Sequence, residues 1–324
     1  MVQYLVYVRT VMTQYIMSIF LALGVLGNLI NIYVFSQKDF RRNSCSLYLL
    51  AASFINLVNV CWGIGPALYN LQNTDPSTYS YIYCKLRLYT IHTSLMIGRT
   101  LIVLACLDRY VLCSQSVRLR SFCQPKVAIR LIIATFLIWP ILTIHIAILQ
   151  NLTGSSCGMT GVYTIIYGFY STMVSGTLPP LLMTIFSILT IRHRLQLRTR
   201  LAGTQRNQKR DHSLVIMLAS EVIVYVVTTS LYPAITLYGA VTSGQTKSAQ
   251  SSQIQTFVSF LGGSFLIYLN SASVFYVYFI GSKNFRKECF VAFRNPIRKI
   301  LGQPNQVEPR VTKTYDTLRR TTLY

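Results

Sequence analysis

Residues 83–110 read YCKLRLYTIHTSLMIGRTLIVLACLDRY, and this stretch decides the fold. Between Arg87 and Asp108 only Arg99 carries a formal charge, and most other residues are apolar. Cys84 and Arg109 stand 25 positions apart, which is about 37 Å along a helix and about one bilayer with its interfaces. The stretch therefore predicts a membrane-spanning helix with Cys84 at one surface and the Asp108-Arg109 pair at the other.

Apolar segments of similar length lie on both sides of this helix. A spanning helix needs roughly 20 mostly apolar residues, and such blocks occupy residues 15–35, 46–69, 212–240 and 255–280. Residues 131–191 contain no Asp, Glu, Lys or Arg and are too long for one helix. The polar, Gly-rich piece 151–158 divides them into a fourth and a fifth span. We therefore predict an all-α bundle of seven transmembrane helices over residues 15–281.

The formal net charge of +22 gathers outside the apolar blocks. Lys and Arg crowd the connections after the first, third and fifth spans and the tail after the seventh, whereas the alternate connections hold almost none. This asymmetry follows the positive-inside rule and places the N-terminus outside and the C-terminus in the cytoplasm. The basic charge thus serves topology and contact with the anionic inner leaflet rather than nucleic-acid binding. We expect a multi-pass protein of the plasma membrane.

Two of the eight cysteines lie on the predicted outer side, where disulfides form. Cys84 begins the third span and Cys157 lies in the second outer connection, so we predict a bridge between them. Asn151, in the sequon Asn-Leu-Thr of the same connection, is the expected glycosylation site. The other six cysteines are predicted to be free thiols: Cys45, Cys61, Cys106, Cys113, Cys123 and Cys289. The sequence has no CxxC pair, so no metal site is expected.

The end of the chain predicts one further helix. Phe285, Cys289 and Phe293 recur every four residues, with Arg286 and Lys287 on the polar side. Residues 282–294 are therefore expected to form a short amphipathic eighth helix on the inner leaflet. Cys289 could carry a palmitoyl group there or remain an ordinary thiol. The predicted division is completed by a short extracellular N-terminus at 1–14 and a cytoplasmic tail at 295–324.

These residues resemble the rhodopsin-like family of G-protein-coupled receptors, and the likeness covers residues 15–293. The positions that carry it are Gly27-Asn28, Asp108-Arg109-Tyr110, Trp139, Pro179-Pro180, Pro233, Asn270-Ser271, Phe275, Tyr278 and Phe285-Arg286. The positions from Asn270 onward are similar to invertebrate neuropeptide receptors, including those for FMRFamide-like peptides. The resemblance implies no enzymatic activity, and the sequence carries no nucleophile elbow, phosphate loop or H-E-x-x-H motif.

The resemblance also implies roles for individual residues. In the family, the Arg of Asp-Arg-Tyr pairs with the Asp at rest and meets the G protein when active, which assigns these roles to Arg109 and Asp108, beside Tyr110. Val117 stands where the family often inserts an apolar side chain into the G protein. Tyr278 corresponds to the tyrosine of the seventh helix that moves on activation.

Several positions depart from the family. Asn56 replaces its Asp in helix two, Gly98 replaces a small polar residue, and Val274 and Phe275 replace its Asn-Pro in helix seven. In the sixth helix, Leu231 replaces a Trp. Members of the family usually bind a sodium ion at these positions. A sodium ion needs a carboxylate and several oxygens, so most of this sodium-binding site is missing here.

Arg99 suggests what stands in place of that site. A charge near the bilayer midplane costs at least about 2.5–3.5 kcal/mol by insertion scales, so Arg99 is expected to face the bundle. We hypothesise that its guanidinium, with Asn56 and Asn270 and with Glu221 near, takes over part of a midplane polar site. The alternative is an arginine that reaches through water to the outer cavity. Glu221 itself has two interpretations, a functional intramembrane acid or a residue near the inner end that meets a cytoplasmic base.

The sequence predicts a receptor that passes an extracellular signal to a heterotrimeric G protein without a cofactor. His92 and His145 are expected to be hydrogen-bonded bundle residues, because no second metal ligand stands at a neighbouring helical position. Ile91 replaces the Asp of amine receptors, and the outer cations Lys85, Arg87 and Lys247 with many tyrosines suit a peptide. The alternatives are a chemosensory receptor for small molecules and, from another class, a seven-span transporter or channel. A retinal protein is excluded because residues 255–280 contain no Lys.

Overall fold

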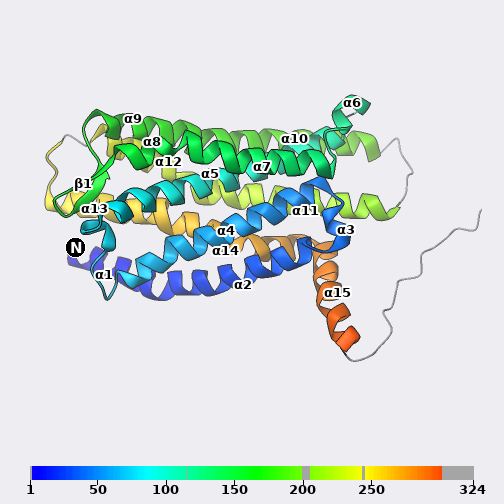
Figure 1. Ribbon diagram of the computed structural model, residues 1–324, viewed down its shortest axis with the longest axis horizontal. Helices are drawn as coiled ribbons and strands as arrows, with labels where there is room; N and C mark the ends of the chain where they lie inside the picture. The colour runs from blue at the N-terminus through cyan, green and yellow to red at the C-terminus, as the bar shows by residue number, and fades with distance from the viewer. Residues whose placement is uncertain (1, 115, 199–204, 243–244, 301–324) are drawn as a thin grey trace, which may run out of the picture.

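The computed structural model describes residues 2–114, 116–198, 205–242 and 245–300, with side chains at 117, 195–198, 205–210 and 295–300 left out of the description. Within that part, seven helical segments are long and apolar enough to cross a membrane, and they run side by side (Figure 1). Numbered in chain order, spans 1 to 7 are Val2–Phe35, Ser44–Tyr69, Tyr81–Leu112, Pro125–Leu149, Val162–Arg194, Asp211–Val241 and Ala249–Gly281. The predicted all-α bundle of seven membrane helices is confirmed.

Most spans contain an irregular turn. Span 1 joins α1 (Val2–Val11), the π-helix η1 (Met12–Met17) and α2 (Ser18–Phe35). Spans 2 and 3 are the single helices α4 (Ser44–Tyr69) and α5 (Tyr81–Leu112), and span 4 joins α7 (Pro125–Leu142) to α8 (Ile144–Leu149). Span 5 joins α9 (Val162–Tyr170), the π-helix η3 (Ser171–Thr177) and α10 (Leu178–Arg198). Span 7 joins α13 (Ala249–Phe260), the π-helix η4 (Leu261–Phe265) and α14 (Leu266–Gly281).

Span 6 is broken at Ser230, between α11 (Gln205–Thr229) and α12 (Leu231–Val241). The break has a local cause, because Pro233 has no N–H to offer the carbonyl of Thr229 four residues earlier.

The connections mark the two ends of the bundle. At one end lie α3 (Lys38–Arg41), α6 (Val117–Arg120) and α15 (Lys283–Ile300), beside the end of α5 that carries Arg109 (Figure 1). At the other lie the 3-10 turn η2 (Pro76–Thr78) and a hairpin of β1 (Gln150–Thr153) and β2 (Ser156–Met159), which pairs Leu152 with Cys157. Gly154 turns the hairpin with a φ of 63°, a value that other residues rarely adopt. We call these the Arg109 end and the Cys84 end.

The outside of the bundle is apolar. Leu137 on span 4 and Val227 on span 6 are 62% and 67% exposed, where a soluble protein would place charged side chains. The main core cluster draws on all seven spans, most of all on spans 2, 3 and 6, and includes Leu49, Leu101 and Tyr278, each nearly inaccessible. An apolar outer surface around a packed interior is the arrangement expected of a helix bundle that is surrounded by lipid.

The first helix begins earlier than the uncharged block 15–35 indicated. It starts at Val2 and includes Arg9, because backbone hydrogen bonds continue through η1 without regard to hydropathy. α1 also packs against α13 of span 7, which gives these first turns a partner. Whether residues 1–14 lie outside the membrane stays a prediction, and the tail 295–324 lies almost wholly outside the described residues.

Candidate functional site

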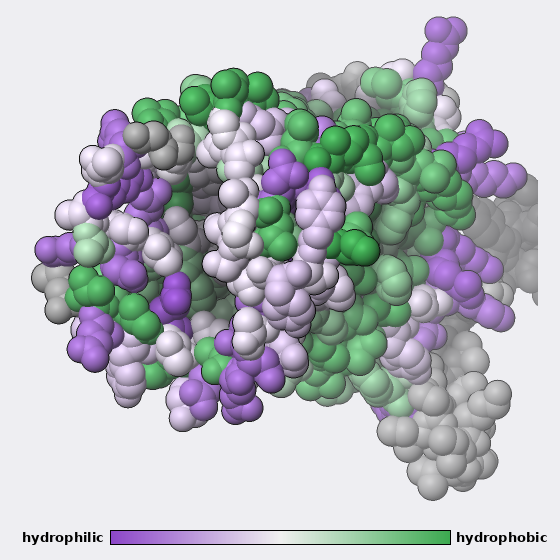
Figure 2. All heavy atoms as spheres, turned by 60° about the vertical axis from the view of Figure 1, so that its left-hand side comes forward, coloured by the Kyte–Doolittle hydropathy of each residue, from purple (hydrophilic) through white to green (hydrophobic). Residues whose placement is uncertain are grey.

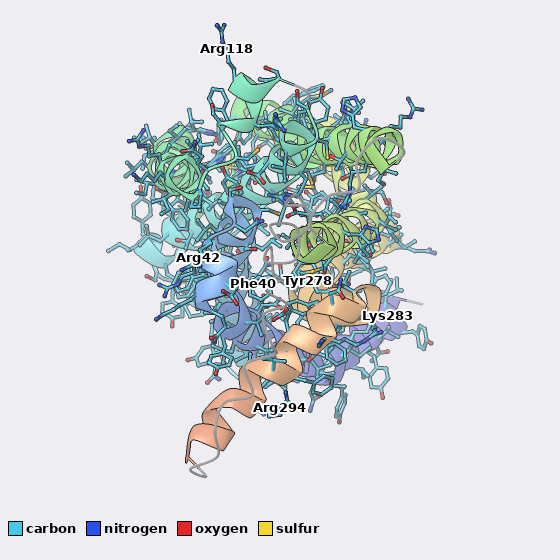
Figure 3. The ribbon with its side chains drawn as sticks, turned by 90° about the vertical axis from the view of Figure 1, so that its right-hand side faces the viewer. Phe40, Arg42, Arg118, Tyr278, Lys283 and Arg294 are labelled. Atoms are coloured by element: carbon cyan, nitrogen blue, oxygen red, sulfur yellow. A yellow bond between two sulfur atoms is a disulfide. The ribbon has the colours of Figure 1, made fainter. Side chains whose placement is uncertain are left out.

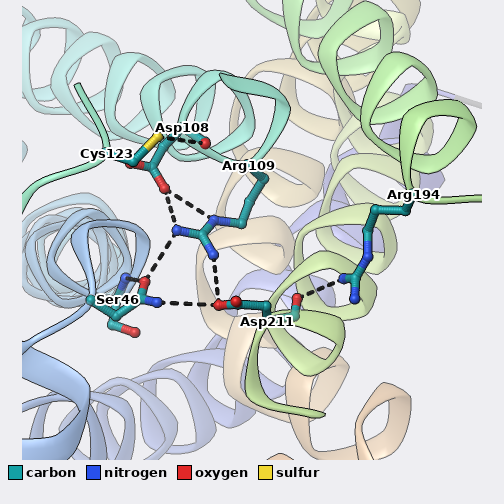
Figure 4. A network of polar contacts seen from close by, with 7 residues as sticks. Ser46, Asp108, Arg109, Cys123, Arg194 and Asp211 are labelled. Atoms are coloured by element: carbon teal, nitrogen blue, oxygen red, sulfur yellow. Dashed lines mark hydrogen bonds and ion pairs between the residues drawn. The ribbon is translucent and has the colours of Figure 1, made fainter. Parts of the chain in front are cut away.

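Asp108 and Arg109 occupy the last turns of α5 and are both buried. The guanidinium of Arg109 forms an ion pair with its neighbour Asp108, as the sequence motif implied. It forms a second ion pair across the bundle, 3.0 Å from Nη1 to Oδ1 of Asp211 at the start of span 6 (Figure 4). One buried cation therefore holds two carboxylates from two different spans.

Asn43 adds span 2 to the same network. As the N-cap of α4, its Oδ1 accepts from the backbone N–H of Ser46 at 3.4 Å. The same oxygen accepts from Nη2 of Arg109 at 3.3 Å, while Nδ2 donates to Oδ1 of Asp211 at 3.4 Å (Figure 4). Arg194 of span 5 donates to the backbone carbonyl of Asp211 at 2.9 Å. The network thus joins spans 2, 3, 5 and 6 at one end of the bundle.

The sequence identified Asp108 and Arg109 but not the partners that cross the bundle. Asp211 was placed just before the predicted sixth span, and Asn43 was not singled out. A usable signal was present, because Asp211 is an acid that directly follows Lys209 and Arg210 in a strongly basic connection. An isolated acid at a helix end is a candidate partner for a buried arginine nearby.

Tyr110 and Val117 lie apart from this network. The Tyr110 ring packs against Phe186 and His193 of α10, with centroid separations of 5.9 and 5.5 Å. Val117 begins α6, and its side chain lies outside the described part of the chain. Arg118, next to it, points away from the bundle at the Arg109 end (Figure 3). The predicted role of Val117 therefore remains a prediction.

Tyr278 and Glu221 meet in the interior between spans 6 and 7. The Tyr278 hydroxyl donates to Oε2 of Glu221, and both side chains are buried. The Tyr278 ring also packs edge-on against Phe35 and Phe285, with centroids 6.2 and 5.9 Å away. The partner of Glu221 is thus a buried hydroxyl rather than the base that one sequence interpretation expected.

Arg99 faces the bundle at mid-height. It lines an internal cavity of about 30 Å³ together with Asn56, Asn270, Gly98 and Glu221, a volume sufficient for water. The structure therefore brings the three residues of the predicted midplane site, Asn56, Arg99 and Asn270, to one cavity.

The hydrogen bonds of Arg99 go elsewhere. Nη1 donates to the carbonyl of Ser175 in η3 at 2.8 Å and contacts the sulfur of Met96 at 3.9 Å. The guanidinium carbon lies 6.0 Å from the ring centroids of both Tyr225 and Tyr232 of span 6, within cation–π range.

The two intramembrane histidines are hydrogen-bonded to tyrosines. His92 Nε2 lies 3.3 Å from the Tyr170 hydroxyl and 3.4 Å from Oγ of Ser175. His145 Nδ1 lies 2.5 Å from the Tyr163 hydroxyl. No cluster of His, Cys, Asp or Glu that could hold a metal ion occurs among the described residues. Both histidines therefore belong to an aromatic network between spans 3, 4 and 5.

The Cys84 end is fixed by the predicted disulfide between Cys84 and Cys157, with Cα atoms 5.8 Å apart. Asp75 pairs with Arg87 at 3.1 Å. Partial burial alone would raise the pKa of Asp75, but hydrogen bonds from Ser77 and the charge of Arg87 outweigh it and lower the pKa below its ordinary value. This ion pair links the connection between spans 2 and 3 to the first turns of α5.

Other polar groups border the same end. Lys85 donates to the carbonyl of Ile148 at 2.7 Å, and Lys247 donates to Gln255 and to Oγ1 of Thr242. Asn151, in β1, is exposed and accessible to a glycosyl group. A hollow opens in the face at this end, bordered by hydrophilic and intermediate side chains (Figure 2).

Cys289 lies on α15, which crosses the Arg109 end beside Tyr278 (Figure 3). Its side chain is 4% exposed and packs into the main core cluster with Phe285. Burial raises the pKa of its thiol to about 12. Whether Cys289 carries a palmitoyl group or remains a thiol stays a prediction.

Comparison with known proteins gives the family context. The sequence profile described as "7 transmembrane receptor (rhodopsin family)" matches residues 27–273. "Probable G-protein coupled receptor B0563.6" of Caenorhabditis elegans is 26% identical over 239 residues, which cover 66% of this chain and 55% of that protein. "Probable G-protein coupled receptor 34" of Mus musculus is 30% identical over 120 residues, 37% of this chain and 32% of that protein. The chain thus spans about half of the first relative and about a third of the second.

Proposed function

Because the chain belongs to the rhodopsin family of seven-transmembrane receptors, we propose that it transmits an extracellular signal to a heterotrimeric G protein. The family is one of receptors rather than enzymes. The observation that carries the proposal is the position of Arg109, which is buried at one end of the bundle and held by Asp211 of another span. Such a contact stabilises one helix packing and must break before that end can open.

The proposed mechanism is a shift between two packings of the Arg109 end. In the resting packing, Arg109 ties span 3 to spans 2 and 6 through Asn43 and Asp211. Movement of span 6 away from span 3 separates Arg109 from Asp211 and opens the bundle end to the G protein. Tyr278, freed from Glu221, then takes part as the moving tyrosine of span 7.

The basic connections support an orientation in which the Arg109 end is cytoplasmic and the Cys84 end extracellular, at the plasma membrane. The hollow at the Cys84 end is then the ligand site (Figure 2). Among the described residues, Lys85 and Lys247 form no ion pair, since their partners are neutral carbonyl, amide and hydroxyl groups. Two uncompensated cations beside tyrosines favour a peptide with acidic or aromatic groups, which we propose is a neuropeptide.

A screen of cells that express the full chain against a neuropeptide library, with second-messenger readout, tests the proposal. The expected result is a dose-dependent response to a peptide that is lost in an Arg109→Ala variant expressed at the same surface level. The same cells are also screened against a small-molecule library. A response to small molecules alone would contradict the peptide ligand and favour a chemosensory receptor. A peptide response that persists at full size in Arg109→Ala would contradict the coupling mechanism.

A further inference from the structure

Span 5 contains a pair of consecutive prolines, Pro179 and Pro180, one residue after the end of the π-helix η3. A proline has no N–H, so it cannot donate to a carbonyl in the preceding turn. In an α-helix the carbonyl of Ser175 would accept from residue 179, and in a π-helix from residue 180. Both positions are proline, and Ser175 is the residue of this helix for which both donors are missing.

The tighter 3-10 arrangement does not supply a donor either. Its donor would be the N–H of Leu178, and that group donates to the carbonyl of Met173 in the π pattern. The Ser175 carbonyl thus has no donor within its own helix, although Ser175 is buried. A buried carbonyl without a partner costs free energy comparable to a lost hydrogen bond.

Arg99 of span 3 supplies the missing donor. Its Nη1 lies 2.8 Å from the Ser175 carbonyl oxygen, and the two residues are 76 positions apart in the chain. We infer that Arg99 is a positioning residue that replaces the N–H groups removed by Pro179 and Pro180, and that this bond holds span 5 against span 3 in the resting packing. The second part rests on the proposed receptor function.

The surroundings show how this bond reaches both ends of the bundle. Toward the Cys84 end, Oγ of the same Ser175 lies near His92, and Ser171 of η3 hydrogen-bonds to Tyr232 at 2.6 Å. Toward the Arg109 end, the guanidinium shares its cavity with Glu221, the partner of Tyr278. A ligand that displaces η3 therefore acts on a cation that borders the polar contacts of spans 6 and 7.

The test is a double-mutant cycle on the full-length protein purified in detergent, with thermal denaturation as the readout. Arg99→Met removes the donor, and Pro180→Ala returns an N–H at the π-helical position. In the Pro180→Ala background, Arg99→Met should be less destabilising than in the unmutated chain, with a coupling of about 2–4 °C in melting temperature. The sign of this coupling does not depend on how much free energy is gained by removing a buried charge.

Pro140→Ala is the matched control. Pro140 also lies inside a membrane span, but the N–H gained there faces the carbonyl of Phe136 in span 4 and not Ser175. Arg99→Met should therefore have the same effect with and without Pro140→Ala. Equal additivity in the Pro180→Ala and Pro140→Ala backgrounds overturns the assignment of Arg99 to Ser175. Arg99→Leu, which also removes the side-chain donor, replaces Arg99→Met if the latter is not recovered.

Basal nucleotide exchange by an added G protein tests the regulatory part on the same variants. Arg99→Met should raise basal exchange, and Pro180→Ala should reduce that rise. Unchanged exchange alongside a positive melting cycle overturns the regulatory part and leaves the structural bond. Failure of the proposed function itself is distinguishable, because the unmutated protein would then stimulate exchange in no G protein, while the melting cycle still tests the bond.

Discussion

Asp211→Asn is expected to raise ligand-independent signalling. The carboxylate accepts from Nη1 of Arg109 at 3.0 Å and from Nδ2 of Asn43 at 3.4 Å, and these contacts join span 6 to spans 3 and 2. Asparagine has nearly the same volume but no charge, so the change weakens the contact without opening a cavity. Arg109 keeps its ion pair with Asp108, and Arg194 still has the backbone carbonyl of residue 211.

The expected rise in basal signalling follows from how far the Arg109–Asp211 ion pair is exposed to solvent. Hydrogen bonds to charged groups contribute about 1.5–3 kcal/mol, whereas solvent-exposed ion pairs contribute about 0–1 kcal/mol. The Arg109 side chain is 3% exposed and that of Asp211 is 33% exposed, so the pair lies between these cases. Taking about 1 kcal/mol for the lost contact, the population ratio of open to resting packing should rise about fivefold.

The assay is basal nucleotide exchange in membranes that contain equal amounts of surface receptor. Asp75→Asn is the control, because Asp75 is 31% exposed, close to the 33% of Asp211, and pairs with Arg87 at the opposite end of the bundle. Basal exchange should rise in Asp211→Asn and stay unchanged in Asp75→Asn. Equal basal exchange in Asp211→Asn and the unmutated receptor would refute the reasoning that this contact restrains span 6.

Three further outcomes are expected. Arg109→Ala should lose G-protein activation but keep much of its ligand binding, which radioligand and exchange assays on the same membranes can separate. Cys84→Ser or Cys157→Ser should abolish surface expression or the ligand response, and mass spectrometry that finds both thiols free in surface protein would contradict the bridge. Agonist binding should be insensitive to replacing sodium by a large organic cation at constant ionic strength, because Asn56 supplies no carboxylate and the charged Arg99 lines the same cavity. Clear inhibition by sodium would contradict this.

The seven spans could be predicted because lipid imposes a strict rule on side chains. Charges are costly in the membrane, so uncharged blocks and basic connections mark the spans directly. The residues at which the helices begin and end could not be predicted from hydropathy and charge in the same way. Span 1 begins at Val2 and not near residue 15, because backbone hydrogen bonding and packing against α13 decide where a helix starts. The π-helices η1, η3 and η4 have no signal in hydropathy at all.

The candidate site was predictable only as far as single helices carry it. Asp108 and Arg109 are adjacent in the sequence, so a local motif identifies them. Asp211 is 102 positions from Arg109, and the choice of this acid depends on how span 6 packs beside span 3. The same holds for Glu221, whose partner Tyr278 comes from span 7 and was not paired with it in advance.

Arg99 shows what a stricter accounting of backbone groups adds. The cost of a charge in the membrane led to the expectation that Arg99 faces the bundle, and the structure places Arg99 in a buried position that lines one cavity with Asn56 and Asn270. Its hydrogen bond, however, goes to a backbone carbonyl, which no list of polar side chains contains. The sequence nevertheless contains the information that identifies this acceptor, since two consecutive prolines leave the carbonyl of Ser175 without its α-helical and π-helical donors. In a membrane span, where water is scarce, such a carbonyl requires a donor from a neighbouring helix, and a buried arginine can provide it.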